Sequence, residues 1–206
     1  MHTIKINGIH YNLTDLEKDC WIRLLNGSLK GRDAFHNATV ANINKQGINM
    51  RTVVLRKVDT ALKTLIFHTD IRSGKWKELN EDNNISCLFY DAVGGMQIRV
   101  SGKANLHHDD EMAEQAWLKS NPNSRKIYMG EIAPSENSEL PTSGLSIEFE
   151  NADPTLEESE TGRKNFGVVV IKVNWMEWLW LNSDGHRRAS FTYDNDNIML
   201  ATWLIP

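Results

Sequence analysis

The stretch that decides the fold reads F-H-N-A-T-V-A-N-I-N-K-Q-G-I-N-M-R-T-V-V-L-R and runs from Phe35 to Arg56. It contains two runs rich in β-branched and apolar residues, 37–43 and 50–58, on either side of the polar segment N-K-Q-G-I-N. Two such runs around a polar break predict an antiparallel hairpin that turns at Gly47.

Similar runs continue along the chain. Further strands are predicted at 63–69, 85–90, 96–106, from 166 onward, at 188–193 and at 198–204, with a turn at the paired glycines 94–95. Helical spacing and capping residues predict helices at 14–27, 73–81 and 109–120, the first beginning at Thr14 and ending at Gly27, the last capped by Asp109. Many short strands with few helices favour a barrel over a parallel α/β sheet.

The charge of the chain is unevenly distributed. The 206 residues carry a net charge of −4, yet 127–162 contains nine carboxylates and no Lys or Arg, so the rest carries +5. Because 133–162 also holds three of the five prolines, we expect a mobile acidic insertion within a single domain, 1–206. The absence of a basic stripe argues against nucleic acid, while a small anionic ligand suits the basic remainder.

Compartment and thiol state follow from what the sequence lacks. No apolar segment near the N-terminus has the form of a secretory signal, and no apolar run reaches ~18 residues. Cys20 and Cys87 lie among apolar neighbours without metal-ligand spacing, which favours buried free thiols over a disulfide. We therefore expect a cytoplasmic protein that does not associate with membranes.

One strand-to-helix turn has the residues of an anion site. Thr69, Ser73 and Lys75 lie where a strand ends and a helix begins, and free N–H groups at a helix start favour an anion. Arg51 and Arg72 would add charge-assisted contacts to a phosphate. The residues alone leave a phosphate site and solvated surface charge as equal alternatives.

No metal or nucleotide signature competes with this turn. The sequence lacks G-x-G-x-x-G, a P-loop, G-x-S-x-G and paired C-x-x-C motifs. The run H-H-D-D at 107–110 projects in different directions at a strand-to-helix junction, which favours a loop and helix cap over a metal site.

Several motifs in order resemble one family. They are R-T-V-V-L-R at 51–56, F-H-T-D at 67–70, S-G-K at 73–75, L-F-Y…M-Q-I-R-V-S-G-K-A at 88–104, W-M-E-W-L-W-L at 175–181, H-R-R at 186–188 and W-L-I-P at 203–206. The ordered set resembles the pyridoxamine 5′-phosphate oxidase-like FMN-binding split barrels over about 35–130 and 166–206. The resemblance implies a mainly β fold with flanking helices, a six-stranded antiparallel Greek-key split barrel, and a homodimer with FMN at the subunit interface.

The resemblance also implies roles for matching positions. Arg51 and Lys75 look like phosphate ligands with Ser73 and Arg72 nearby, and Gln97 looks like the glutamine that hydrogen-bonds the flavin. Arg188 and Trp180 resemble the arginine and tryptophan near the flavin ring. The backbone along the ring and ribityl chain would come from Thr52, Val53, Val54, Arg56, His68 and Thr69. No catalytic residue and no metal ligand is assigned.

Departures from the family pattern bear on the substrate. Gly74 replaces an arginine of the family's S-R-K triplet, and the partner-chain Q-S pair has no clear equivalent. The oxidase's own substrate positions read Arg56, S-N-P at 120–122 with Trp117, and H-R-R. Each lost charged hydrogen bond weakens binding roughly 10- to 150-fold, so pyridoxamine phosphate is an unfavourable substrate.

Three functions are compatible with these residues. The first is an FMN-dependent oxidoreductase acting on a small-molecule substrate that the sequence does not identify. The second is a non-catalytic flavin or haem protein, in which His68 or His186 would be the axial ligand. The third is a pyridoxamine 5′-phosphate oxidase proper.

Overall fold

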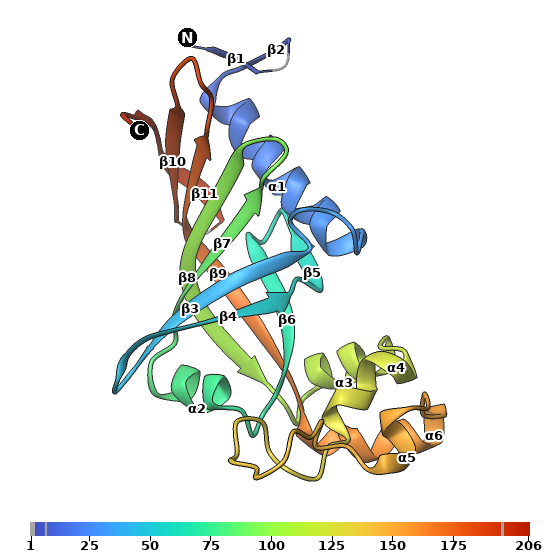
Figure 1. The fold of residues 1–206 in the computed structure, drawn as a ribbon. Helices are drawn as coiled ribbons and strands as arrows, with labels where there is room; N and C mark the ends of the chain where they lie inside the picture. The colour runs from blue at the N-terminus through green and yellow to red at the C-terminus, as the bar shows by residue number, and fades with distance from the viewer. Residues whose placement is uncertain (1–2, 7, 195) are drawn as a thin grey trace. The chain divides into compact units, whose positions relative to one another are not determined.

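The computed structural model describes residues 3–6, 8–194 and 196–206 (Figure 1). Its strands are β1 Ile4–Ile6, β2 Ile9–Tyr11, β3 Asn37–Asn44, β4 Gly47–Val54, β5 Lys57–Asp59, β6 Thr64–Asp70, β7 Asn84–Asp91, β8 Met96–His107, β9 Phe166–Trp180, β10 Arg187–Asp194 and β11 Asn197–Leu204. Its helices are α1 Leu13–Leu29, α2 Gly74–Glu81, α3 Glu111–Leu118, α4 Pro122–Arg125, α5 Ile147–Glu150 and α6 Leu156–Ser159, with 3₁₀ turns η1 Lys126–Tyr128 and η2 Glu160–Asn165.

The chain divides into two compact units. The first comprises 1–67, 84–104 and 170–206, and the second comprises 68–83 and 105–169. The first unit holds α1 and most of the sheet, and the second holds the remaining helices. No helix in the described part of the chain is both long and apolar enough to cross a membrane.

Most described strands join one sheet. Its order is β11-β10-β9-β8-β7-β3-β4, with β5 paired to β6 and β6 to β9, while β1 and β2 form a separate two-stranded sheet. The predicted mainly β, antiparallel architecture is confirmed, and the hairpin at Gly47 forms as expected, Asn44 pairing with Gly47. The predicted number of six strands is too low, because nine strands of the described residues belong to the main sheet.

Alternation along the strands gives the sheet of the first unit two distinct faces. Val40, Ile98, Val100 and Phe191 are fully buried on one face, which we call the inner face. α1 packs against this face, where the Nε1 of Trp21 donates to the hydroxyl of Tyr193 at 3.0 Å. The opposite face, which we call the open face, carries the polar side chains described below.

Helix α1 confirms the predicted buried stripe and corrects its ends. Leu16, Cys20 and Leu24 are all fully buried, as their spacing predicts. The cap is Asn12 rather than Thr14, because the Asn12 side chain accepts from the Asp15 N–H at 2.9 Å. Gly27 does not end the helix. It is needed because a Cβ there would lie 2.6 Å from the carbonyl carbon of Phe35.

A second glycine is required where two strands approach closely. Gly102 on β8 faces β9, and a Cβ at this position would lie 2.8 Å from the carbonyl carbon of Lys172 and 3.0 Å from the Cα of Val173. Real Cβ atoms do not approach other heavy atoms this closely, so only glycine fits here. The G-K-A motif thus contains a steric requirement of the sheet.

The second unit is held together by aromatic and charged contacts. Phe166 packs against Trp117 and Tyr128, each with ring centroids 5.1 Å apart. The guanidinium of Arg125, which is 1% exposed, donates to the Trp117 carbonyl and forms an ion pair of 2.5 Å with Glu160. The C-terminal part of the acidic segment is therefore fixed to α3 and α4.

Two predicted boundaries differ in detail. The predicted strand 50–58 is split into β4 and β5, because the N–H groups of Leu55 and Arg56 bond to the carbonyls of His36 and Ile66 instead of to β3. The cap of α3 is Asp110 rather than Asp109, since the Asp110 carboxylate accepts from the Ala113 N–H at 2.9 Å and lies 2.7 Å from His107 Nδ1. These hydrogen bonds hold the pKa of Asp110 below its usual value.

Candidate functional site

The open face of the first unit carries a continuous row of side chains across four strands. Thr52 on β4 pairs with Thr39, Thr39 with Leu88, and Leu88 with Arg99 on β8. Gln97 lies two residues before Arg99 and pairs with Tyr90, so it projects from the same face. Three of the predicted positions, Thr52, Val54 and Gln97, thus share one face.

A buried carboxylate extends this face to β9 and β10. Glu177 is 3% exposed, and its Oε1 accepts from Arg99 Nε at 3.0 Å and Nη2 at 2.7 Å. Its Oε2 accepts from Arg188 Nη2 at 2.5 Å. The carboxylate therefore fixes two guanidinium groups, whose side chains are 44% and 31% exposed, at the edge of the solvent.

The charge of this cluster suits an anionic or electron-rich ligand. One carboxylate shared by Arg99 and Arg188 leaves one positive charge in excess. Arg99 also lies over the indole of Trp175, with 5.5 Å between its Cζ and the ring centroid. The Nε of Arg188 is buried without a hydrogen-bond partner in the described chain, which leaves a donor for a ligand oxygen.

Three other predicted residues of this unit lie apart from that face. Arg51 pairs with the buried Val40, which places it on the opposite side of β4 from Thr52. There its Nη1 donates to Asn42 Oδ1 and to the Asn49 carbonyl, the latter at 3.2 Å. Val53 shares the side of Arg51, and Arg56 follows β4 as an exposed residue.

Trp180 is separated from Arg188 by the pleat of the sheet. It pairs with Arg187, whereas Arg188 pairs with Leu179. Neighbouring residues of a strand project to opposite faces, so the Trp180 indole and the Arg188 guanidinium lie on different faces. Both residues nonetheless line one pocket at the end of the sheet.

The second unit brings together the residues of the predicted phosphate turn. Ser73 caps α2, with its Oγ 3.4 Å from the Trp76 nitrogen, and lies 3.3 Å from the Thr69 hydroxyl. The Lys75 ammonium donates to the same Thr69 hydroxyl. Two hydroxyls, an ammonium and the first N–H groups of a helix thus converge, which is a donor set suited to a phosphate.

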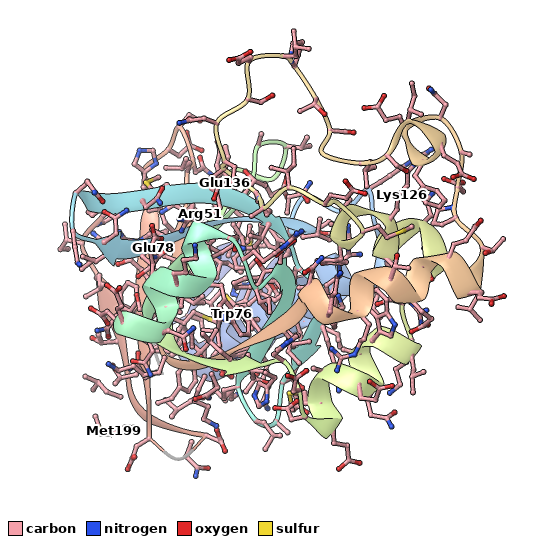
Figure 2. All side chains as sticks on the ribbon, turned by 90° about the horizontal axis from the view of Figure 1, so that it is seen from below. Arg51, Trp76, Glu78, Lys126, Glu136 and Met199 are labelled. Atoms are coloured by element: carbon pink, nitrogen blue, oxygen red, sulfur yellow. The ribbon has the colours of Figure 1, made fainter. Side chains whose placement is uncertain are left out.

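The start of α2 is held against β9 by one aromatic residue. Trp76 on α2 (Figure 2) lies over Gly167, where a Cβ would be 2.6 Å from its ring. This contact lies within the second unit and sets the distance between the helix and the strand.

Arg72 has a structural role in the same turn. Its Nε and Nη2 donate to the Asp70 carboxylate at 3.0 and 2.7 Å, and its Nη1 donates to the Gly130 carbonyl at 2.9 Å. The hydrogen bond with Asp70 raises the pKa of Arg72. The family has an arginine at the position of Gly74. Because most of its donors are engaged, Arg72 does not take the place of that arginine.

His68 and His186, the two histidines considered as axial ligands of haem, each contact other residues of the chain. His68 packs edge-on against Phe166, with ring centroids 4.8 Å apart, and the exposed His186 accepts from the Asn182 N–H at 3.1 Å. Within the described ranges, no three His, Cys, Asp or Glu side chains gather in a way that would hold a metal ion.

Asn121 and Trp117 occupy positions that bind substrate in the oxidase proper, but here they make structural contacts. Asn121 caps α4, accepting from the Ser124 N–H at 2.8 Å. Trp117 is fully buried and donates to Glu160 at 2.9 Å. The Asn121 oxygen and the Trp117 ring are therefore both engaged within the second unit.

Glu177 is the residue that sequence reasoning missed. A glutamate inside the apolar run W-M-E-W-L-W is a signal of a paired buried charge, because an unpaired one would be costly. Its partners lie 78 and 11 residues away in the sequence. Only the strand register identifies them.

Comparison with known proteins agrees with this geometry. Residues 18–108 match the family model described as pyridoxamine 5′-phosphate oxidase, FMN-binding domain. No curated protein matches the chain.

Solved structures share the fold at low sequence identity. An FMN-binding protein related to pyridoxamine 5′-phosphate oxidase from Nostoc punctiforme is 17% identical with a TM-score of 0.71, covering 92% of this chain and 97% of that one. PhzG from Burkholderia lata, solved with tetrahydrophenazine-1-carboxylic acid, is 17% identical with a TM-score of 0.71, covering 98% and 99%. These likenesses confirm the split-barrel fold. The family match covers 18–108, and the model that it matches describes an FMN-binding domain.

Proposed function

We propose that this protein is an FMN-dependent oxidoreductase that acts on a small-molecule substrate in the cytoplasm. The observation that carries the proposal is the donor set at the start of α2, where Thr69, Ser73 and Lys75 converge. This set occurs inside the segment that matches an FMN-binding domain. A phosphate monoester is the group that such donors recognise best.

Different residues of the chain would bind the phosphate and the ring of the cofactor. Ser73, Thr69 and Lys75 would bind the phosphate, with Arg51 as the additional ligand that the family pattern implies. Gln97 would hydrogen-bond the ring, and Arg188, fixed by Glu177, would present its guanidinium on the same face as Gln97. When bound, FMN supplies two-electron transfer to or from the substrate.

The exposed part of the open face supports a homodimer. Ile43, Ile48, Met50 and Tyr90 are 54%, 74%, 61% and 48% exposed and project from this face of β3, β4 and β7. Exposed apolar side chains in such number mark an interaction surface. We propose that a second copy covers this surface and that the cofactor lies at the interface.

The substrate is proposed to differ from pyridoxamine 5′-phosphate. The capping role of Asn121 and the burial of Trp117 remove two of the expected substrate contacts. The single domain remains part of the same proposal, and so does the mobility of the acidic insertion at 133–162, except for its C-terminal part, which Arg125 holds through Glu160.

A flavin titration tests the proposal. The full chain is expected to bind FMN, with the visible absorbance of the bound flavin, and Lys75→Gln is expected to bind it at least tenfold more weakly, since a charged hydrogen bond contributes about 1.5–3 kcal/mol. Lys77→Gln, an exposed lysine on the same helix, is the matched control and should bind as the parent does. A chain that ignores FMN, or equal effects of the two substitutions, would contradict the proposal.

Turnover is tested separately on the holoprotein. Stopped-flow reduction of bound flavin by nicotinamide nucleotides is expected if the protein is an oxidoreductase. Tight binding without reduction by any donor would favour a storage protein instead. Peroxide release on adding pyridoxamine phosphate would instead support the third function, a pyridoxamine 5′-phosphate oxidase proper.

A further inference from the structure

Strand β11 is the last strand of the main sheet at one edge. Among the described strands it pairs with β10 alone, so the backbone N–H and C=O groups of its outer side have no strand beside them. Such a row of groups is a template for another strand. We propose that β11 pairs with β11 of a second copy of this chain, as two antiparallel strands that join the two sheets.

The exposed side chains of β11 are apolar. Ile198, Met199 (Figure 2) and Leu200 are 37%, 67% and 56% exposed. The run N-I-M-L-A-T-W-L-I at 197–205 contains no charged residue and no proline. Proteins usually protect an exposed edge strand with lysine, other charges or proline, so an apolar edge without them is typical of a strand that pairs.

The regular part of β11 sets the register of the proposed pair. A β-bulge between Thr192 and Tyr193 interrupts the pairing with β10 at Met199, and the pairing of 200–204 beyond it is regular. Because a bulge disrupts a ladder locally, 200–204 is the part that accepts another strand. Its centre is Thr202, so the two-fold axis of the pair would pass beside this residue.

This register makes the two strands complementary to each other. Leu200 of one copy would face Leu204 of the other, which brings two apolar side chains together. Ala201 would face Trp203 in the same way, and the two copies of Thr202 would face each other. Apolar and Thr–Thr pairs of this kind stabilise antiparallel strands.

The charges at the two ends of β10 favour the antiparallel arrangement. The exposed Asp194 ends β10 at the turn to β11, and the exposed Arg187 begins it at the other end. Neither side chain forms an ion pair within the described chain, where Arg187 donates to two backbone carbonyls. An antiparallel pair brings the acidic end of each copy toward the basic end of the other, whereas a parallel pair would bring like charges together.

This interface is distinct from the one proposed for the homodimer. The exposed apolar side chains of that surface lie on β3, β4 and β7, toward the other end of the strand order. A surface that pairs with its own copy closes after two copies, so each interface joins one pair. A chain that uses both interfaces therefore forms an assembly larger than a dimer.

Oxidative cross-linking of the full chain tests the register. Facing residues of antiparallel strands have Cα atoms about 4.5–5.5 Å apart, which a disulfide spans. We expect Thr202→Cys to form a covalent dimer with copper phenanthroline, while the native thiols Cys20 and Cys87 are buried. Ser28→Cys, at a position that is likewise half-buried in the same unit, is the control. Equal yields of covalent dimer from the two variants would overturn the pairing.

Light scattering measures the mass of the assembly. Leu200→Lys should halve the mass of the parent particle, because a lysine on an edge strand prevents pairing. Ile22→Lys places the same charge on α1 at a position of similar exposure, 54% against 56%, and should keep the parent mass.

Two results of the mass measurement would overturn the inference. One is a monomeric parent chain. The other is an unchanged mass in Leu200→Lys, which is the result expected if a peptide of another protein covers the edge. If Leu200→Lys does not fold, the cross-linking of Thr202→Cys decides.

Flavin titration separates this inference from the proposed function. Leu200→Lys is expected to bind FMN within about twofold of the parent, because β11 lies outside the proposed cofactor site. A parent chain that does not bind FMN, together with specific cross-linking of Thr202→Cys, would contradict the proposed function and leave the pairing standing. FMN binding without that cross-link would overturn the pairing alone.

Discussion

Glu177 accepts a hydrogen bond of 2.5 Å from Arg188 while remaining 3% exposed, and the same carboxylate also holds Arg99. A buried carboxylate is stable only when it is paired, and here two guanidinium groups from different strands pair with it. The link across β8, β9 and β10 both fixes the sheet and presents a positive charge on its open face.

Replacing this carboxylate should destabilise the sheet. We expect Glu177→Gln to lower the free energy of unfolding by about 1–2 kcal/mol, a value reduced for solvent screening because both arginines are partly exposed. Urea unfolding measures the change. Arg99→Gln should cost less, since Arg188 still pairs with the carboxylate, so an equal or larger loss in Arg99→Gln would show that Glu177 is not the centre of the cluster.

The role of Arg51 can be tested in the same flavin titration as Lys75. We expect Arg51→Ala to weaken FMN binding by about 2 kcal/mol, roughly thirtyfold, through the loss of one charged contact to the phosphate. Arg32→Ala serves as the control. Circular dichroism of Arg51→Ala checks that the contacts of Arg51 with Asn42 and Asn49 are not needed for folding. An FMN affinity equal to that of the parent chain would show that Arg51 does not belong to the site.

Arg125 should control how firmly the acidic segment is held in the second unit. Arg125→Met removes the donors to the Trp117 carbonyl, Ser159 and Glu160, and we expect a loss of about 2–4 kcal/mol. Because 127–162 lacks Lys and Arg but contains nine carboxylates, a glutamate-specific protease is the suitable probe.

Cleavage of this segment should be faster in Arg125→Met than in the parent chain. Lys126→Met, which changes the neighbouring, partly exposed cation, provides the comparison. Similar digestion of the two variants would mean that Arg125 does not anchor the segment.

The buried thiols should make the protein sensitive to alkali. Burial raises the pKa of Cys87 from 9.0 to about 12, so the stability that this thiol contributes is complete below pH 9 and is lost as the pH rises toward 12. The loss approaches about 1.4 kcal/mol per pH unit for each such thiol in this window. Cys20 adds to it, since burial raises its pKa as well.

Unfolding in urea at pH 8 and pH 10.5 measures the effect. Cys87→Ala should show a smaller loss of stability between the two pH values than the parent chain, whatever packing it loses at pH 8. The same pH dependence in both proteins would assign the alkaline loss to other groups.

Local patterns predicted the elements well because each depends on neighbouring residues. The buried stripe of α1, the start of α2 near Ser73 and the hairpin at Gly47 all follow from spacings of two to four residues. Glu177 could not be assigned in this way, since its partners Arg99 and Arg188 are brought to it only by strand pairing.

The face on which a strand residue lies was equally hard to predict. The resemblance groups Arg188 and Trp180 near one flavin ring, yet the pairings of Arg188 with Leu179 and of Arg187 with Trp180 place them on opposite sides of the sheet. One residue of register decides this, and the register depends on the length of the turn between β9 and β10.

Because β8 and β9 approach closely at Gly102, a glycine at this position in another sequence indicates the fold rather than cofactor binding. A methyl group there would displace the Lys172 backbone whether or not a cofactor is bound. A chain that keeps this glycine but lacks the donors of Thr69, Ser73 and Lys75 would retain the barrel after losing the chemistry. The two kinds of signature should therefore be scored separately when a distant homologue is judged.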